Sequence, residues 1–373
     1  GTIGNQAISV TMGKCIGGSS TVNSATCFRT PDHVLANWQR DLGLDRLTGD
    51  NLDPYFERVE KILNVTELPW EVLGKNAQIV KRGCDKLGLT CRPLKHNVKD
   101  CKGCGPCQFG CQEGAKQSVD VTYVPLAEKF GAKIYANCRA DRLIIRNGMV
   151  HGVKAVLKSS KTGQTYQAEI VSKMVVVSGG AMITPAFLKR NRLKNYHIGR
   201  HLQIHPGARV VALMDETVEG WKGVSQGAYV DDFEGQGIML EGVFVHPSIL
   251  LSAMPGVGRE HKEMAMKYNN LAAFGVMAHD ETTGRVFKTP ARIFFAAGAQ
   301  KIYTGVSKMP VLASEKEVDD FLNLHIKPLH MELLAFHPLG SCRMAAHPGM
   351  GAVSPAGETW DVRNLFVSDG SIV

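Results

Sequence analysis

Residues 174–189 constrain the fold of this chain more than any other segment. Their first five residues, Met-Val-Val-Val-Ser, form an apolar run without alternation, which is typical of a strand buried on both faces of a sheet. Gly179-Gly180 follows at once, and Thr184-Pro185 opens a helix. Strand, glycine turn and helix in this order present backbone N–H groups to a phosphate-bearing cofactor. The segment therefore predicts an α/β layer, although no G-x-G-x-x-G pattern after an N-terminal strand is present.

Composition narrows the class further. The chain has 373 residues, of which 44% are hydrophobic, enough for a large core and two domains. The net charge is +8, but the basic residues are scattered, which argues against nucleic-acid binding and is compatible with a peripheral membrane or an acidic redox partner. The sequence contains no apolar run of about 18 residues, the length that a helix needs to span a bilayer.

Local patterns predict the remaining elements. Residues 207–300 alternate Val, Phe and Met with glycine breaks, which predicts a large antiparallel sheet suited to be the floor or lid of a substrate pocket. Residues 13–30 predict a loop of small residues that runs into a short helix. The predicted helices are 51–63, 76–88, 119–130 and 314–323; the predicted strands are 133–136, 140–145, 150–158, 165–171 and 365–367, with a hairpin turn at Asn147-Gly148.

A run of cysteines with the spacing C-x2-C-x2-C-x3-C occupies residues 101–111. This spacing opens the cysteine run of bacterial ferredoxins, which favours a 4Fe–4S cluster held by Cys101, Cys104, Cys107 and Cys111. Cys84 or Cys91 could replace Cys111 as the fourth ligand. A structural zinc ion and reduced or disulfide-linked cysteines are the alternatives. Ten cysteines are too few for a disulfide scaffold, so we expect a reducing compartment, the cytoplasm.

Five segments resemble, in the same order, the motifs of the glucose–methanol–choline (GMC) family of FAD-dependent oxidoreductases. They are Gly13–Asn23, Val177–Pro185, Ile198–Pro206, His337–Met344 and Val362–Ser371. The cysteine run with Glu113–Ser118 after it is similar to the branch that contains long-chain alcohol oxidases and related bacterial dehydrogenases.

The resemblance implies a fold, a cofactor and site residues. We expect an α/β (α+β) protein with a Rossmann-like FAD-binding domain and a substrate domain built on a large antiparallel sheet. His337 would be the general base that removes the hydroxyl proton of an alcohol, while flavin N5 takes the hydride. The resemblance assigns FAD contacts to Gly17, Gly18, Ser19, Asn23, Ala140, Gly180, Asp369 and Gly370. For Asn23, an ordinary helix-start residue is the alternative.

The family's N-terminal strand with G-x-G-x-x-G and its C-terminal tail with a second catalytic His or Asn do not occur in this sequence. We expect both to lie outside it. The predicted division is 1–75 and 131–206 for FAD binding, 76–130 for a cysteine-rich insertion, 207–330 for the substrate domain and 331–373 for the catalytic C-terminal part.

The leading hypothesis is a flavin-dependent dehydrogenase, favoured over an oxidase, that acts on a small-molecule alcohol of apolar character, long-chain or cyclic. Its electrons would pass through the cluster to an external protein acceptor. The alternatives are a ferredoxin-like electron-transfer subunit and an inactive structural homologue.

Overall fold

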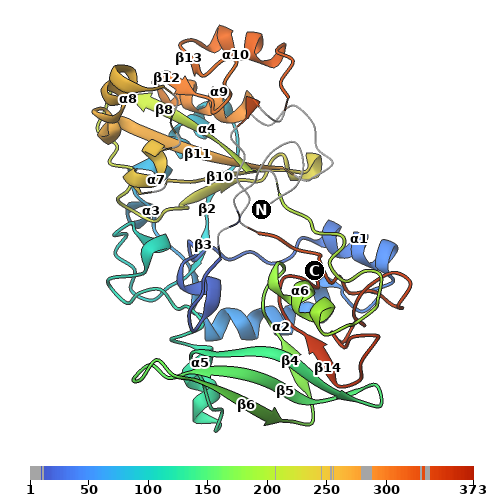
Figure 1. Ribbon diagram of the computed structural model, residues 1–373. Helices are drawn as coiled ribbons and strands as arrows, with labels where there is room; N and C mark the ends of the chain where they lie inside the picture. The colour runs from blue at the N-terminus through green and yellow to red at the C-terminus, as the bar shows by residue number, and fades with distance from the viewer. Residues whose placement is uncertain are drawn as a thin grey trace. The chain divides into compact units, whose positions relative to one another are not determined.

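A computed structural model describes residue 10 and residues 12–373, apart from 206, 245, 253, 255, 279–287, 328–329 and 332–336 (Figure 1). The described chain divides into two compact units. Unit 1 comprises residues 1–28, 58–126 and 205–335, and unit 2 comprises residues 29–57, 127–204 and 336–373.

Unit 1 is built on a seven-stranded sheet with the strand order β13-β12-β8-β11-β10-β9-β2, in which every pair is antiparallel. A second sheet of two strands pairs β1 with β3. The strands are β1 Val65–Glu67, β2 Cys91–Pro93, β3 Lys95–Asn97, β8 Gly207–Met214, β9 Ala228–Val230, β10 Ile238–Gly242, β11 Leu271–Ala278, β12 Ala299–Tyr303 and β13 Val311–Leu312. The helices are α3 Trp70–Leu73, α4 Lys75–Leu87, α7 Pro247–Ser252, α8 Gly258–Ala265, α9 Lys288–Ala297 and α10 Glu315–Leu322, with short turns η1 Gly18–Thr21, η2 Cys107–Phe109, η3 Glu234–Gln236 and η4 Tyr268–Asn270.

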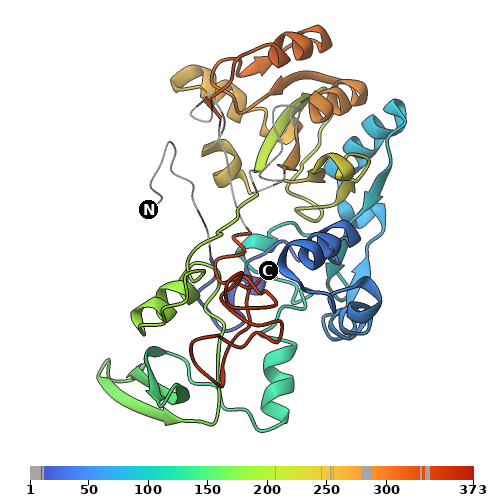
Figure 2. The same cartoon turned by 90° about the vertical axis from the view of Figure 1, so that its right-hand side faces the viewer.

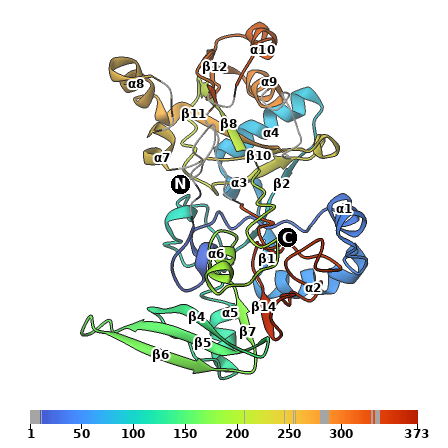
Figure 3. The ribbon, with the colours of Figure 1, turned by 45° about the vertical axis from the view of Figure 1, so that its right-hand side comes forward.

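The two faces of the large sheet are covered by different helices. One face packs against α4, α9 and α10 and forms the main core, with Phe274 and Phe294 fully buried in it. Part of the opposite face packs against α7, α8 and η4 through side chains such as Leu250 and Met264. Figure 3 shows α7 and α8 on one side of the sheet and α4 and α9 on the other.

Unit 2 contains a three-stranded antiparallel sheet, β4-β5-β6, drawn in green (Figure 2), and a parallel pair, β7-β14. Its core joins Leu188 of helix α6 to Leu365 and Val367 of strand β14. The elements are α1 Asp32–Leu42, β4 Cys138–Arg146, β5 Met149–Lys158, β6 Thr165–Val171, β7 Val175–Val177, α6 Ile183–Arg190 and β14 Leu365–Val367. Helices α2 Gly49–Ile62 and α5 Tyr123–Lys129 each cross a boundary between the units.

Most local predictions are confirmed. The large antiparallel sheet, the strand 165–171 and the helices that begin near 51, 76 and 315 are present. Asn147 and Gly148 adopt φ values of 50° and 71° between β4 and β5, as expected for a tight hairpin turn. The short helix predicted in residues 13–30 is the single turn η1.

Two predictions are wrong. Residues 133–136 form no strand, and the exposed fractions of Ile134 and Tyr135 are 44% and 62%, so this apolar stretch has neither a ladder partner nor a core to enter. Strand β7 is not buried on both faces in the described structure, because Val176 is 54% exposed. Among the described residues, no helix has the length and apolar character needed to cross a membrane.

Candidate functional site

The loop predicted to lie along the cofactor pyrophosphate belongs to unit 1. Gly17 and Gly18 have φ values of 86° and 57°, a region that favours glycine. A Cβ atom on Gly17 would lie 2.9 Å from Asp120, whereas one on Gly18 would meet no atom within 4 Å. Ser19 Oγ accepts a hydrogen bond from Gly13 N at 3.0 Å. The loop thus presents bare backbone at Gly18 to open space, an arrangement that an anionic group fits.

Asn23 is an exposed residue at the end of this loop. Its Oδ1 accepts a hydrogen bond from Ala25 N at 3.0 Å, and Ala25 has the left-handed φ of 64°. The side chain therefore stabilises a turn and does not stand at the start of a helix, the position that the alternative predicted. Its contact with the flavin stays a prediction.

The cysteine segment is joined to the same loop by a buried lysine. Lys116 is 5% exposed, and its Nζ donates to Asn23 O at 2.8 Å and to Cys107 O at 2.9 Å. Burial lowers the pKa of this amine. Val119 N also donates to Ser20 Oγ at 3.0 Å. The two segments, about a hundred residues apart in sequence, therefore form one local structure.

Two glycines of the cysteine segment pack against the backbone of two other segments of unit 1, one at Val72 and one at Trp221–Gly223. A Cβ atom on Gly105 would collide with Trp221 O, and one on Gly103 would collide with Val72 O. Gly223 N donates to Gly103 O at 2.6 Å. The segment therefore needs glycine at both positions because no side chain would fit.

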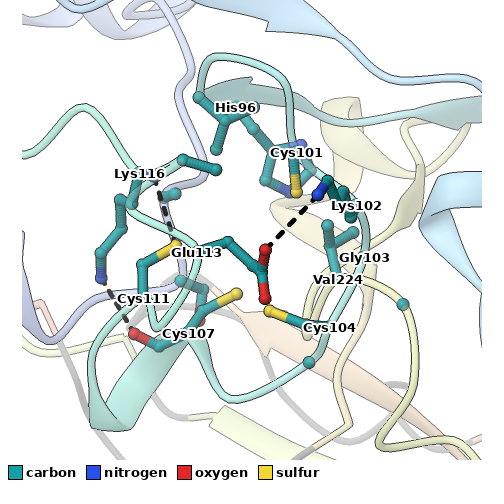
Figure 4. A pocket seen from close by; sticks show the side chains of 16 residues that line it. His96, Cys101, Lys102, Gly103, Cys104, Cys107, Cys111, Glu113, Lys116 and Val224 are labelled. Atoms are coloured by element: carbon teal, nitrogen blue, oxygen red, sulfur yellow. Dashed lines mark hydrogen bonds and ion pairs between the residues drawn. The ribbon is translucent and has the colours of Figure 1, made fainter.

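The four cysteines line one pocket together with His96, Glu113 and Lys116 (Figure 4). The sulfur atoms of Cys104 and Cys107 point toward each other in this view. Burial, with the neighbouring thiols as a further cause, raises the pKa values of Cys101 and Cys104, so both thiols are neutral at pH 7 in the metal-free protein.

The predicted cluster site is not supported by this arrangement. Within the described ranges, no group of three or more His, Cys, Asp or Glu side chains is placed to hold a metal ion. All ten cysteines are free, and the two proposed substitutes for the fourth ligand, Cys84 and Cys91, lie outside the set of residues that line the pocket.

The glycine turn after β7 belongs to unit 2 and is organised by one carboxylate. Asp369 Oδ2 accepts hydrogen bonds from Gly180 N at 2.8 Å and from Thr184 Oγ1, and its Oδ1 accepts from Ser371 N at 2.8 Å. Gly180 has a φ of 84°, and a Cβ atom on it would meet nothing within 4 Å. Like Gly18, Gly180 thus offers open backbone that fits a closely approaching cofactor.

His337 begins a turn that packs against the same region of unit 2. Gly340 N donates to Gly370 O at 3.2 Å, and Leu339 exchanges two hydrogen bonds of 3.0 Å with Gln203. Ser341 Oγ donates to Ala181 O. The His337 side chain keeps accessible surface, while desolvation by the surrounding protein lowers its pKa.

The structure therefore brings Gly180, Asp369, Gly370 and the turn after His337 together within unit 2, and Gly17, Gly18, Ser19 and Asn23 together within unit 1. Ala140 is exposed on strand β4, and within the described part of the chain no side-chain hydrogen bond joins it to either group of predicted residues.

Sequence reasoning missed three polar residues of these sites, although each lies inside a motif. Lys116 links two loops, Thr184 bonds to Asp369, and Ser341 holds the His337 turn to Ala181. The position of each polar residue inside a motif could have indicated a role. The hydrogen-bond partner could not be identified, because it lies far away in the sequence.

Comparison with known proteins defines the class. Models of the GMC oxidoreductase family match residues 1–207 and 273–373. The chain belongs to the GMC oxidoreductase family.

Individual relatives agree with this assignment. The chain is 30% identical over 397 residues to an uncharacterized GMC-type oxidoreductase of Mycobacterium tuberculosis, an alignment that covers 100% of this chain and 62% of the relative. It is 28% identical over 404 residues to a long-chain-alcohol oxidase of Arabidopsis thaliana, covering 96% of this chain and 55% of that protein. The chain thus spans between about half and two thirds of the length of these relatives.

Solved structures share the fold. Pyridoxine 4-oxidase from Mesorbium loti has a TM-score of 0.66 at 18% identity, covering 97% of this chain and 79% of that one. An Aspergillus oryzae formate oxidase, studied for its FAD modification, has a TM-score of 0.68 at 15% identity, covering 97% and 80%. The fold of this chain, a mixture of helices and sheets with a large antiparallel sheet, is therefore that of FAD-binding GMC oxidoreductases. FAD is the cofactor that the comparisons support.

Proposed function

We propose that the protein oxidises an alcohol to an aldehyde or ketone, with FAD as cofactor and His337 as the base. The observation that carries the proposal is the His337 turn, which is hydrogen-bonded to the Gly180–Asp369 region within one unit. Bound FAD supplies the hydride acceptor at flavin N5. The family resemblance assigns contacts with FAD to Gly180, Asp369 and Gly370, which the Asp369 carboxylate holds together, and also to Gly17, Gly18 and Ser19.

His337 has the properties of a proton acceptor. Desolvation lowers the pKa of its imidazole below the ordinary value of 6.5, so the ring is neutral at pH 7 and can take the hydroxyl proton. The bonds of Leu339, Gly340 and Ser341 fix the backbone that follows His337.

The experiment compares His337→Ala with His347→Ala, which removes an exposed histidine ten residues away. We expect the first substitution to lower the rate of flavin reduction by an alcohol about 10²–10⁴-fold and the second to leave it unchanged. Because the neutral imidazole is the active form, the rate should rise with pH and level off above the lowered pKa of His337. Equal rates in the His337→Ala variant and the parent, at equal FAD content, would contradict the proposal.

We keep a separate proposal for the cysteine segment, that it binds a 4Fe–4S cluster and makes the protein a dehydrogenase with a protein acceptor. The ferredoxin-like spacing of the four cysteines supports it. No step of the proposed reaction passes through the cluster, because the described residues hold no preformed ligand group. We also propose a cytoplasmic location, because ten free cysteines fit a reducing compartment.

Anaerobic purification with iron and sulfide analysis tests this second proposal. We expect four iron atoms per chain, lost in Cys104→Ser and kept in Cys15→Ser, a control outside the segment. Iron-free protein with undiminished alcohol oxidation and direct consumption of oxygen would reject the cluster and leave the flavin chemistry standing.

A further inference from the structure

Two cysteines outside the cysteine segment, Cys84 and Cys91, lie where helix α4 ends and strand β2 begins, within unit 1. Cys84 is in the last turn of α4 and is fully buried, whereas Cys91 is partly exposed. Both carry free thiols. Neither belongs to the pocket that the cysteine segment lines, so they form a separate pair.

The connection between the two elements turns the chain back toward Cys84. Gly88 has a φ of 68°, its N–H donates to Asp85 O at 3.4 Å, and Leu89 N donates to Cys84 O at 3.0 Å. These are the two bonds of a Schellman motif, which ends a helix and reverses the chain across its last turn. Strand β2 therefore starts beside the turn of α4 that carries Cys84.

The strand register gives the direction of the Cys91 side chain. Cys91 is paired directly with Val230, and directly paired residues project on the same face of a sheet. Val230 is fully buried in the main core together with Cys84, and Cys91 packs against this core. The side chain of Cys91 thus lies on the face of the sheet that α4 covers.

The two thiols are in contact. A hydrogen bond joins the side chains of Cys84 and Cys91, and this bond together with burial raises the pKa of Cys84. Cys84 is therefore a neutral thiol at pH 7, shielded from solvent. Cys91 is the thiol of the pair that a dissolved oxidant can reach, and Cys84 stands beside it as a second sulfur.

We propose that Cys84 and Cys91 form a redox-active dithiol, a covalent modification site that a hydroperoxide converts into a disulfide. The site is independent of the proposed alcohol oxidation and of the proposed cluster, because it uses neither the His337 turn nor the cysteine segment.

The reaction takes two steps. The Cys91 sulfur attacks one peroxide oxygen, so that an S–O bond forms, the O–O bond breaks, and the departing oxygen takes up the thiol proton. The Cys84 sulfur then attacks the Cys91 sulfenic acid, so that the S–S bond forms and the hydroxyl group leaves with the Cys84 proton as water. The two thiols together lose two electrons, which reduce the peroxide.

Peptide mapping of the full-length purified chain tests the proposal. The protein is treated with hydrogen peroxide, its remaining thiols are blocked with N-ethylmaleimide, and it is digested with trypsin. Cleavage at Lys86 separates the cysteines into peptides 83–86 and 87–95, since Pro93 protects the bond after Arg92. We expect mass spectrometry to find these two peptides joined, lighter than their sum by two hydrogen atoms, and separated again by dithiothreitol.

Three variants assign the roles of the two thiols. In Cys84→Ala, Cys91 should stop at the sulfenic acid, which dimedone traps. In Cys91→Ser, the buried Cys84 should remain a thiol. Cys27→Ser is the matched control, because Cys27 is also partly exposed but has Ala25 O and Asn97 Oδ1 as its partners, both at 3.7 Å; the joined peptides should remain.

Three results would overturn the proposal. They are recovery of both thiols blocked in the peroxide-treated parent, oxidation of Cys91 to a sulfinic acid while Cys84 stays blocked, and a disulfide that links Cys91 to a peptide other than 83–86. The melting temperatures of the reduced variants report whether they fold. If Cys84→Ala does not fold, the parent and Cys91→Ser still decide between these results and the expected one.

Discussion

The glycine turn of residues 178–184 and the cysteine segment of residues 101–111 are both short loops identified by a motif, yet they are held in different ways. The turn depends on a carboxylate, Asp369, which accepts bonds from Gly180 N, Thr184 Oγ1 and Ser371 N. The cysteine segment depends on an ammonium group, Lys116, which donates to two backbone carbonyls.

The difference concerns which backbone groups remain for a ligand. In the glycine turn an acid occupies one N–H group and leaves open space at Gly180. In the cysteine segment a buried cation satisfies carbonyl groups, and the thiols around it remain free. The first loop thus leaves open backbone for a ligand, and the second is a packed connection to the loop of residues 13–24.

The largest expected effect comes from Asp369→Ala, which removes the acceptor of all three bonds in the glycine turn. Hydrogen bonds to a charged group contribute about 1.5–3 kcal/mol each, so we expect the free energy of unfolding to fall by about 3 kcal/mol or more and the FAD content to fall with it. Urea denaturation and flavin absorbance after gel filtration measure the two quantities.

Thr184→Val is the graded control for Asp369→Ala, since it keeps the carboxylate and removes one of its three donors, together with the acceptor of Gly179 N. The loss of one bond to a charged group should lower the free energy of unfolding by about 1.5–3 kcal/mol, less than the loss of all three. An effect of Thr184→Val as large as that of Asp369→Ala would show that the threonine, not the acid, organises the turn.

A smaller effect is expected for Lys116→Met, which keeps the length of the side chain and removes the ammonium group. The loss leaves the carbonyls of Asn23 and Cys107 without this donor, although it also removes a buried charge that burial already disfavours. We expect the free energy of unfolding to fall by about 1–2 kcal/mol and proteolysis to become faster within residues 101–116.

Lys102→Met, a change at an exposed lysine of the same segment, should leave both the stability and the proteolysis pattern unchanged. A larger loss of stability in Lys116→Met than in Asp369→Ala would show that the lysine of the cysteine segment contributes more to the fold than the carboxylate of the glycine turn, contrary to our expectation.

The sequence determines local structure where the cause is local. Asn147-Gly148 predicts a hairpin because both residues tolerate positive φ, and the structure has it. The same reasoning fails at residues 133–136, where an apolar run has no strand to pair with. The pairing of β2 with β9 joins Cys91 to Val230, and nothing in either short segment indicates the other.

The residues of the candidate site also divide into those that the sequence indicates and those that depend on distant partners. Gly180 and Asp369 are 189 residues apart, and only the resemblance to a family indicated both. Lys116 was not predicted, since the sequence gives the type of a side chain but not which carbonyl groups surround it. The cysteine spacing indicated a metal centre, but spacing along a chain does not fix the direction of four thiols.

The two glycines of the cysteine segment have a consequence for transplanting it. Gly103 and Gly105 lie directly against the backbone near Trp221 and Gly223, more than a hundred residues further along the chain. An eleven-residue peptide with the same cysteine spacing, grafted onto another scaffold, would lack the surface against which those glycines close. The cysteine segment therefore keeps its conformation only together with its distant backbone contact. A search for similar loops in other proteins should require both the cysteine spacing and this contact.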